Sequence, residues 1–249
     1  MDALASPQAN DVAFPGDDCA LRGAFARAAA PSAPAVVLIP DVFGVSPLYR
    51  TLAGRLAGAG VHALVLDIYV RQGTPRLASP AAVMAWIASL DDHQILHDVG
   101  AAARWLAARG DVVPAGVGVL GFCLGGQIAF MAGCRIPELH AAVSFYGMLR
   151  QPSRGPHKEV DPLEMARDLD CPWLGHFGDE DALIPLADVE ALRRALDASR
   201  VATRIEVYPG AGHAFLNEAR PEAFRPEAAA LAWSRTLEFL RATLGAATA

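Results

Sequence analysis

Six short apolar segments, separated by helix-like stretches, constrain the fold of this chain more than any other feature. Most of them are continuously apolar instead of alternating, which is typical of strands buried on both faces. Strands that alternate with helices form a parallel sheet with helices on both of its faces. We therefore predict an α/β fold with a mostly parallel central sheet. The predicted strands are residues 35–39, 61–66, 117–120, 141–145, 172–177 and 203–208, with edge strands near 11–14 and 20–26.

Residues between these strands carry signals for helix starts. Two Ser-Pro pairs, at 46–47 and 79–80, combine an N-cap residue with proline at the first helical position. Asp91 or Asp92 is expected to cap a further helix. The polar, irregular stretch 151–170 predicts a flap with a short helix.

Composition and charge exclude several classes of protein. The 249 residues are 53% apolar and carry a net charge of −6 with no basic run, so we expect no nucleic-acid or anionic-membrane partner. No apolar stretch reaches the roughly 18 residues of a membrane span, and the first ten residues lack the features of a secretion signal. The four cysteines form no CxxC pair, which favours reduced thiols and a cytoplasmic location.

The segment 121–126, Gly-Phe-Cys-Leu-Gly-Gly, has the form glycine, any residue, nucleophile, any residue, glycine. It lies between a predicted strand and a helix-like stretch, the context in which this pattern forms a strained turn that exposes a nucleophile. The free N–H groups at the start of the following helix would favour a thiolate at Cys123. The alternative is a buried cysteine in a glycine-rich turn, and the pattern alone does not decide between them.

The predicted sheet brings further reactive side chains to the same edge. In parallel sheets the chemistry occurs at the carboxyl ends of the strands. Five suitable side chains follow predicted strands and are expected on one rim, which supports the nucleophile interpretation. They are Asp41, Cys123, Tyr146, Asp181 and His213.

A thiol nucleophile needs a base, an acid that orients the base, and donors for the oxyanion. His213, in a loop that Gly210 and Gly212 allow to bend over the turn, is the predicted base. Asp181 is the predicted acid, and Asp179 is its rival two residues earlier. The N–H groups of Leu124 and Val42 are the predicted oxyanion donors.

Four segments together resemble the dienelactone hydrolase (carboxymethylenebutenolidase) family of α/β-hydrolases. They are the 121–126 segment, Asp-Val-Phe-Gly-Val at 41–45, Asp-Ala-Leu-Ile-Pro at 181–185 and Gly-Ala-Gly-His-Ala-Phe at 210–215. The resemblance covers roughly residues 12–243 of one domain that spans 1–249. It implies Cys123 as the nucleophile, His213 as the base and Asp181 as the acid. It also implies hydrolysis of a small lactone or ester, without a cofactor or metal.

The chain departs from the family pattern at two places. The family carries a glutamate near the resting thiol, where this chain has the shorter Asp41. Asp41 is expected to bond the Cys123 thiol or steer His213, or else only to cap a turn. The family also binds the substrate carboxylate with arginines, one of them at the position of Asn217, and Arg76 is the nearest candidate for the other.

For several other residues a structural role is an alternative to a functional one. Phe43, Phe122, Tyr146 and Trp86 are pocket candidates that could equally close the core. His93 and His97 have a spacing that can bind metal, but a solvated helix face is the expected arrangement. His62 is expected in the core, and His176 near the active rim without an acidic partner.

We therefore expect a hydrolase of a small lactone or carboxylic ester that works through Cys123. One alternative is a broad carboxylesterase or thioesterase for neutral esters. Another is a hydrolase-like protein that binds a ligand, or senses oxidants through Cys123, without turnover. A monomer is expected, with a homodimer left open.

Overall fold

The computed structural model describes residues 7–245. Their eight strands form one central sheet. The strands are hydrogen-bonded in the order β1-β2-β4-β3-β5-β6-β7-β8. From β4 to β8 all neighbouring strands are parallel, whereas β1 and β2 form an antiparallel edge. The strands are β1 (Asn10–Pro15), β2 (Ala20–Ala26), β3 (Ala33–Ile39), β4 (His62–Leu66), β5 (Val112–Phe122), β6 (Ala142–Phe145), β7 (Trp173–Gly178) and β8 (Thr203–Tyr208). The predicted inner strands and edge strands are thus confirmed, although β5 starts earlier than expected.

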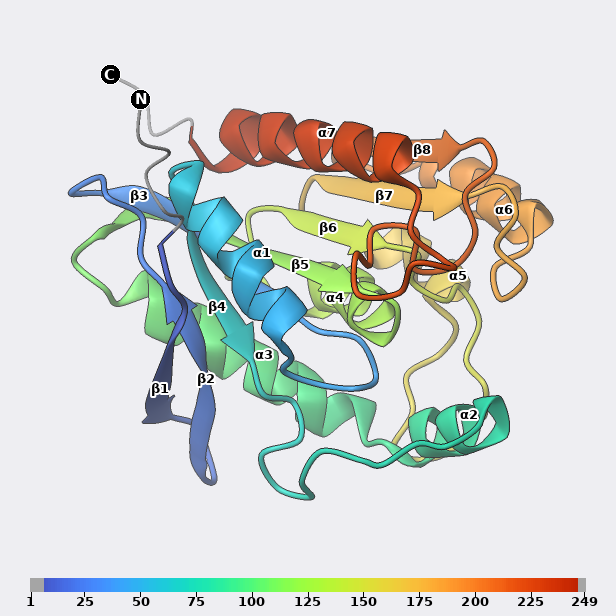
Figure 1. Ribbon diagram of the computed structural model, residues 1–249, viewed down its shortest axis with the longest axis horizontal. Helices are drawn as coiled ribbons and strands as arrows, with labels where there is room; N and C mark the ends of the chain where they lie inside the picture. Colours follow the sequence, from blue (N-terminus) through green and yellow to red (C-terminus); the bar gives the residue numbers. More distant parts are fainter. Residues whose placement is uncertain (1–6, 246–249) are drawn as a thin grey trace.

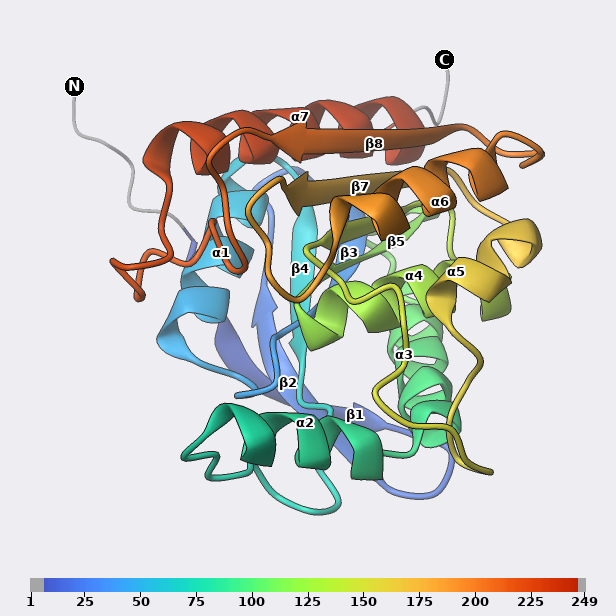
Figure 2. The same ribbon diagram turned by 90° about the vertical axis from the view of Figure 1, so that its right-hand side faces the viewer.

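Helices cover both faces of the sheet. Figures 1 and 2 show α1 and α7 on one face and α3, α4 and α6 on the other, while α2 lies beyond the strand ends. Residues of β3 and β4 are almost completely buried between these layers, as expected for continuously apolar strands. The helices are α1 (Pro47–Gly58), α2 (Pro80–Ser89), α3 (Asp92–Ala107), α4 (Leu124–Arg135), α5 (Pro162–Met165), α6 (Leu186–Leu196) and α7 (Pro226–Leu244), with a 3-10 turn η1 (Ala166–Asp168).

The predicted helix starts are found at the predicted residues. Ser79 Oγ accepts a hydrogen bond from Ala82 N at 3.2 Å, and Asp91 Oδ1 accepts one from Gln94 N at 3.0 Å. Ser46 occupies the N-cap position of α1, but its side chain makes no capping bond. Proline at the first helical position therefore marks the start of α1 without help from the serine hydroxyl.

The polar segment after β6 is anchored by a buried ion pair. The Lys158 and Asp92 side chains are 4% and 3% exposed, and their charged groups lie 2.5 Å apart. The other Asp92 oxygen accepts from Gln151 Nε2 at 2.7 Å, and Lys158 Nζ also donates to the carbonyl of Ile87. Removing one partner of such a pair costs about 3–5 kcal/mol. The predicted flap is therefore fixed to the junction of α2 and α3.

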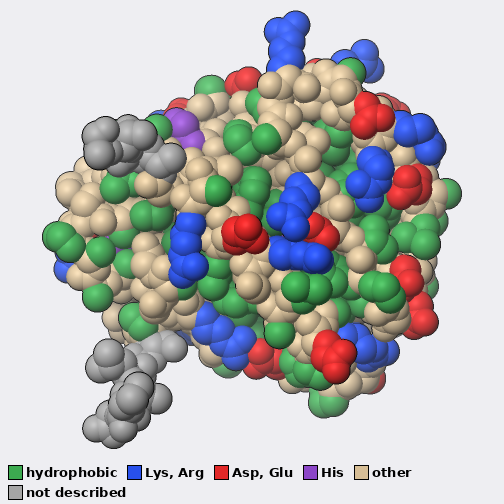
Figure 3. Space-filling view, turned by 90° about the horizontal axis from the view of Figure 1, so that it is seen from above, with side chains coloured by type: hydrophobic (Ala, Val, Ile, Leu, Met, Phe, Trp, Pro, Cys, Tyr) green, Lys and Arg blue, Asp and Glu red, His purple; other side chains and the backbone are tan. Residues whose placement is uncertain are grey.

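The outer surface mixes both signs of charge. Figure 3, which looks onto the molecule from the side of α7, shows acidic and basic side chains interspersed among apolar ones. Arg235 of α7, for example, pairs with Glu206 at 2.8 Å. No helix within residues 7–245 is both long and apolar enough to cross a membrane.

Candidate active site

Cys123 sits on a strained turn between β5 and α4. Its backbone has φ 55° and ψ −117°, a conformation that costs a non-glycine residue on the order of 1 kcal/mol or more. The two flanking glycines permit the turn, because strand and helix nearly touch. A Cβ on Gly121 would lie 1.8 Å from Gly125 O, and one on Gly125 would lie 2.2 Å from Ile39 O. The expected nucleophile turn is thus formed, and the Cys123 side chain is half-buried above the sheet.

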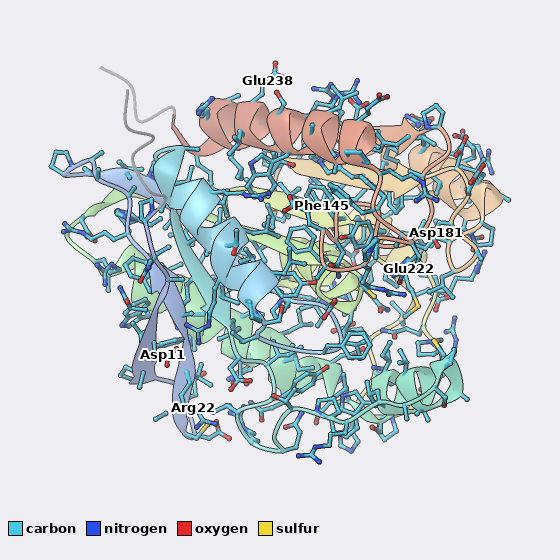
Figure 4. The ribbon with its side chains drawn as sticks, in the orientation of Figure 1. Asp11, Arg22, Phe145, Asp181, Glu222 and Glu238 are labelled. Carbon is cyan, nitrogen blue, oxygen red and sulfur yellow. The ribbon has the colours of Figure 1, made fainter. Side chains whose placement is uncertain are left out.

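The thiol of Cys123 is joined to an imidazole and a carboxylate. His213 Nε2 lies 3.1 Å from Cys123 Sγ, and His213 Nδ1 lies 2.8 Å from Asp181 Oδ2. The second Asp181 oxygen accepts from Leu183 N at 2.8 Å, so both oxygens of this buried carboxylate are engaged. The rival Asp179 instead accepts from Gly210 N at 2.7 Å and supports the histidine loop. Figure 4 labels Asp181 at this edge of the sheet.

The surroundings of His213 favour its protonated form. Burial lowers the pKa of His213, but the hydrogen bonds and negative charges of Asp181 and Cys123 outweigh it and raise the pKa from 6.5 to about 10. An imidazolium next to a sulfur is the arrangement that keeps a cysteine reactive. The same histidine can then hold a proton for a leaving group.

Two backbone N–H groups in the loops around Cys123 donate to no protein acceptor within residues 7–245. Within residues 7–245, the first amide of α4 to reach a carbonyl is that of Gln127, which donates to Cys123 O at 3.0 Å. The amide of Leu124 therefore has no protein acceptor beside Cys123, as expected for a helix N-terminus. The Val42 N–H also donates to no protein acceptor in this part of the chain. Both predicted oxyanion donors thus lack a protein acceptor in the part of the chain that the structure describes.

Asp41 makes a turn rather than a hydrogen bond to the thiol. Its Oδ1 accepts from Phe43 N at 3.0 Å, and its carbonyl accepts from Gly44 N at 3.0 Å. Burial raises the pKa of Asp41, opposed by hydrogen bonds from Phe43 and Tyr49 and by nearby positive charge. Of the roles expected for Asp41, the turn is thus the one seen in its hydrogen bonds.

The aromatic pocket candidates separate into different environments. Phe122 is fully buried and stacks on Phe145 with ring centres 4.8 Å apart, so of the two roles left open for it, the structure shows packing in the core. Tyr146 is also buried, with its ring edge-on to His213 at 5.2 Å. Phe43 is 45% exposed at the rim. Trp86, on α2, packs against the ring of Tyr69 at 5.8 Å.

Arg220 is a cation near the site that sequence reasoning missed. Asn217, at the position where the family has arginine, is buried, and its Oδ1 accepts from Ala219 N at 3.0 Å, so it caps a turn. Arg220 follows three residues later, and its positive charge opposes the pKa increase that burial causes at Asp41 and Tyr146. Its guanidinium pairs with Glu222 at 3.0 Å. The signal in the sequence was an arginine in the same loop as His213. Arg76, the candidate chosen from sequence, is exposed.

The remaining histidines lie outside this centre. His176 is buried, bonds the Tyr208 hydroxyl at 2.8 Å, and burial lowers its pKa to about 3. His62 is buried and accepts from Ala28 N at 3.0 Å. His93 and His97 lie on the exposed side of α3, where their nearest acids are Glu159 and Asp17. Within residues 7–245 no group of three or more acidic, histidine or cysteine side chains could hold a metal ion.

The strand order, the two helical layers and the strained turn at Cys123 define an α/β-hydrolase fold. Residues 21–244 match the model of the dienelactone hydrolase family, to which this chain belongs. Members of this family hydrolyse lactones or esters, and the chain is accordingly a lactone or ester hydrolase.

Curated relatives and solved structures agree with this assignment. A Bradyrhizobium protein provisionally named 2-oxo-3-(5-oxofuran-2-ylidene)propanoate lactonase is 36% identical over 208 residues, or 84% of this chain and 83% of the relative. An Escherichia coli K12 protein provisionally named carboxymethylenebutenolidase is 34% identical over 84% of this chain and 76% of its own length. A crystal structure of a provisionally assigned dienelactone hydrolase from Klebsiella pneumoniae has a TM-score of 0.86 and 33% identity, and covers 93% of this chain and 97% of that one.

Proposed function

We propose that Cys123 is the nucleophile of this hydrolase, with His213 as its base and acid and Asp181 as the group that orients His213. The observation that carries the proposal is the continuous chain of contacts, 3.1 Å from sulfur to imidazole and 2.8 Å from imidazole to carboxylate. Each distance is within the range needed for proton transfer or its electrostatic support. Asp181 would hold the imidazole in one tautomer and stabilise its cation.

The reaction would proceed in two steps. In the first step His213 holds the proton that leaves the thiol while the Cys123 sulfur attacks the acyl carbon. The N–H groups of Leu124 and Val42 bind the developing oxyanion. The carbon–oxygen bond then breaks, and His213 donates its proton to the departing oxygen. In a lactone that oxygen stays attached to the acyl group, so the ring opens into a thioester. His213 then takes a proton from water, the hydroxide attacks the thioester, and the acid leaves as the thiolate reforms.

The proposed substrate is a small lactone or ester that carries an anionic group. The relatives named as a lactonase and a carboxymethylenebutenolidase support a lactone. Arg220 supplies a positive charge near the site, which supports binding of a carboxylate although Asn217 replaces the family arginine. A neutral ester is the second candidate, because Phe43 exposes an apolar ring at the rim.

The test is steady-state hydrolysis by the wild type and Cys123→Ala. The panel contains cis- and trans-dienelactone, neutral p-nitrophenyl esters and thiol esters. We expect lactone turnover that falls to background in Cys123→Ala and survives in Cys19→Ala, a control that removes another incompletely buried thiol. Turnover of neutral esters alone would favour the second candidate. Absence of Cys123-dependent turnover on the whole panel would refute the proposal and favour a binding or redox role.

A further inference from the structure

The peptide that joins Val42 to Phe43 is held at both of its polar ends. Its carbonyl, Val42 O, accepts a hydrogen bond from the Tyr69 hydroxyl at 3.0 Å. Its N–H, on Phe43, donates to Asp41 Oδ1 at 3.0 Å. Rotation of this peptide would break both bonds at once. The loop after β3 is thus fixed by one side chain from its own turn and one from the loop after β4.

The preceding peptide, from Asp41 to Val42, carries the free N–H. Its carbonyl accepts from Gly44 N at 3.0 Å and therefore faces into the turn. In a trans peptide the N–H points opposite to the carbonyl, so the Val42 N–H points out of the turn. Together the three bonds leave the Val42 N–H with little freedom to rotate.

The side chains that hold the loop are themselves fixed. Tyr69 is fully buried, its N–H donates to Asp67 Oδ1 at 3.0 Å, and its ring packs edge-on against Trp86. Burial raises the pKa of Tyr69, so its hydroxyl keeps the proton that it donates. Gly44 has φ +76°, and a Cβ there would lie 3.3 Å from the Tyr69 ring, so the turn and the tyrosine fit closely.

We propose that Tyr69 and Asp41 are positioning residues that orient the Val42 N–H toward the oxyanion. This inference rests on the proposed function, in which Val42 is an oxyanion donor. It assigns to the Asp41 carboxylate oxygen a role on the backbone instead of on the thiol. A hydrogen-bond donor that is already oriented before the reaction stabilises the transition state without the cost of reorganisation. Neither residue touches the substrate in this scheme.

Three substitutions separate this role from its alternatives. Tyr69→Phe removes the hydroxyl and keeps the ring, and Asp41→Ala removes the acceptor of the Phe43 N–H. Each should lower kcat about tenfold with little change in KM, a part of the roughly 10²–10³ that loss of an entire oxyanion donor costs. Asp41→Asn keeps an oxygen acceptor without the charge, so kcat should stay within about threefold of the wild type.

Tyr208→Phe is the matched control for the loss of a buried tyrosine hydroxyl. The Tyr208 hydroxyl bonds His176, away from the nucleophile, so its removal should leave kcat unchanged. Circular dichroism and thermal melts would show that each variant is folded.

The decisive readout is affinity for a trifluoromethyl ketone, which forms a tetrahedral oxyanion with the thiol. Tyr69→Phe and Asp41→Ala should weaken this inhibitor about tenfold while KM for the substrate stays constant. Equal inhibitor affinity in wild type and Tyr69→Phe would overturn the inference. A loss in Asp41→Asn as large as in Asp41→Ala would show that the Asp41 charge acts on the thiol, and would also overturn it. Either outcome leaves the proposed nucleophile intact, since that is tested separately by Cys123→Ala.

Discussion

The loops after β5, β7 and β8 hold the three proposed catalytic side chains, whereas the loop after β3 holds a proposed backbone donor, the Val42 N–H. On the first side, Cys123, His213 and Asp181 contact one another directly. On the second side, the Val42 N–H is held by a turn and by Tyr69. The three side chains would make and break bonds, and the Val42 N–H, together with the Leu124 N–H after β5, would stabilise the charge that forms. A side chain can be exchanged without moving the chain, but a backbone donor can be changed only through the residues that support it.

This difference predicts a graded response to mutation. The largest losses of activity are expected from changes to Cys123, His213 and Asp181, the side-chain half of the site, and smaller losses from changes around the Val42 N–H, its backbone half. His213→Ala removes both the proton acceptor and the proton donor, so kcat/KM should fall by at least about 10³-fold. His97→Gln, on the exposed side of α3, is the control and should keep full activity. Steady-state hydrolysis of the best substrate measures both. A decrease of less than about tenfold in His213→Ala would mean that another group activates the thiol.

The second prediction concerns the carboxylate that supports His213. Asp181→Asn keeps the size of the side chain and removes its charge, and kcat should fall by about 10²–10⁴. Asp179→Asn, which alters only the support of the histidine loop, should cost much less.

The pH profile sharpens this second prediction. Because the pKa of His213 is raised to about 10, the imidazolium persists through neutral pH, and activity should fall as the pH rises through about 10. The positive charge of His213 also stabilises the folded protein. This stabilisation is complete below pH 6.5 and is lost as the pH rises through about 10. Asp181→Asn removes a negative neighbour and should move the alkaline limb to lower pH. An unchanged limb would mean that it does not report on His213.

The two halves also differ in how well the sequence predicts them. The strands, most helix starts and the meeting of Cys123, His213 and Asp181 follow from apolar periodicity and from loops at the carboxyl ends of strands. Tyr69 stood in a loop with no sign of its function, because its partner is a carbonyl that every residue possesses. The sequence leaves the role of Phe122 open for a related reason: it places an aromatic residue beside Cys123 but does not show whether its ring points to the pocket or to the core.

Histidine illustrates the same limit on sequence reasoning. His176 lies near the carboxyl end of β7, and His213 lies in the loop after β8. Their pKa values nevertheless move in opposite directions, to about 3 for His176 and about 10 for His213. His176 is buried beside a hydroxyl, and the positive charges of Arg235 and Arg204 add to the effect of desolvation. His213 has Asp181 as its partner. The environment of each ring depends on tertiary packing, which a local pattern does not contain.

The third prediction addresses substrate charge. Arg220→Gln should raise KM for a carboxylated lactone about tenfold and leave KM for a neutral ester unchanged, because an exposed guanidinium gives a modest charge-assisted contact. Arg76→Gln, the residue favoured from sequence alone, is the matched control and should affect neither. Equal effects of Arg220→Gln on both substrates would show that this arginine supports the loop instead of binding the carboxylate.

The smallest predicted effect is a gain in stability from Asp41→Asn. Burial raises the pKa of Asp41, so ionising this carboxyl opposes folding: its favourable contribution is complete at low pH and is lost as the pH rises through the raised pKa. An amide keeps the bond from Phe43 N and never ionises. Asp41→Asn should therefore raise the melting temperature at pH 7 by a few degrees, corresponding to about 1 kcal/mol, and the gain should vanish near pH 3. Thermal melts of both proteins across this pH range measure the effect. A melting temperature lowered at pH 7 would mean that the Asp41 charge is stabilised by its positive neighbours, and that the backbone half of the site depends on electrostatics as strongly as the side-chain half.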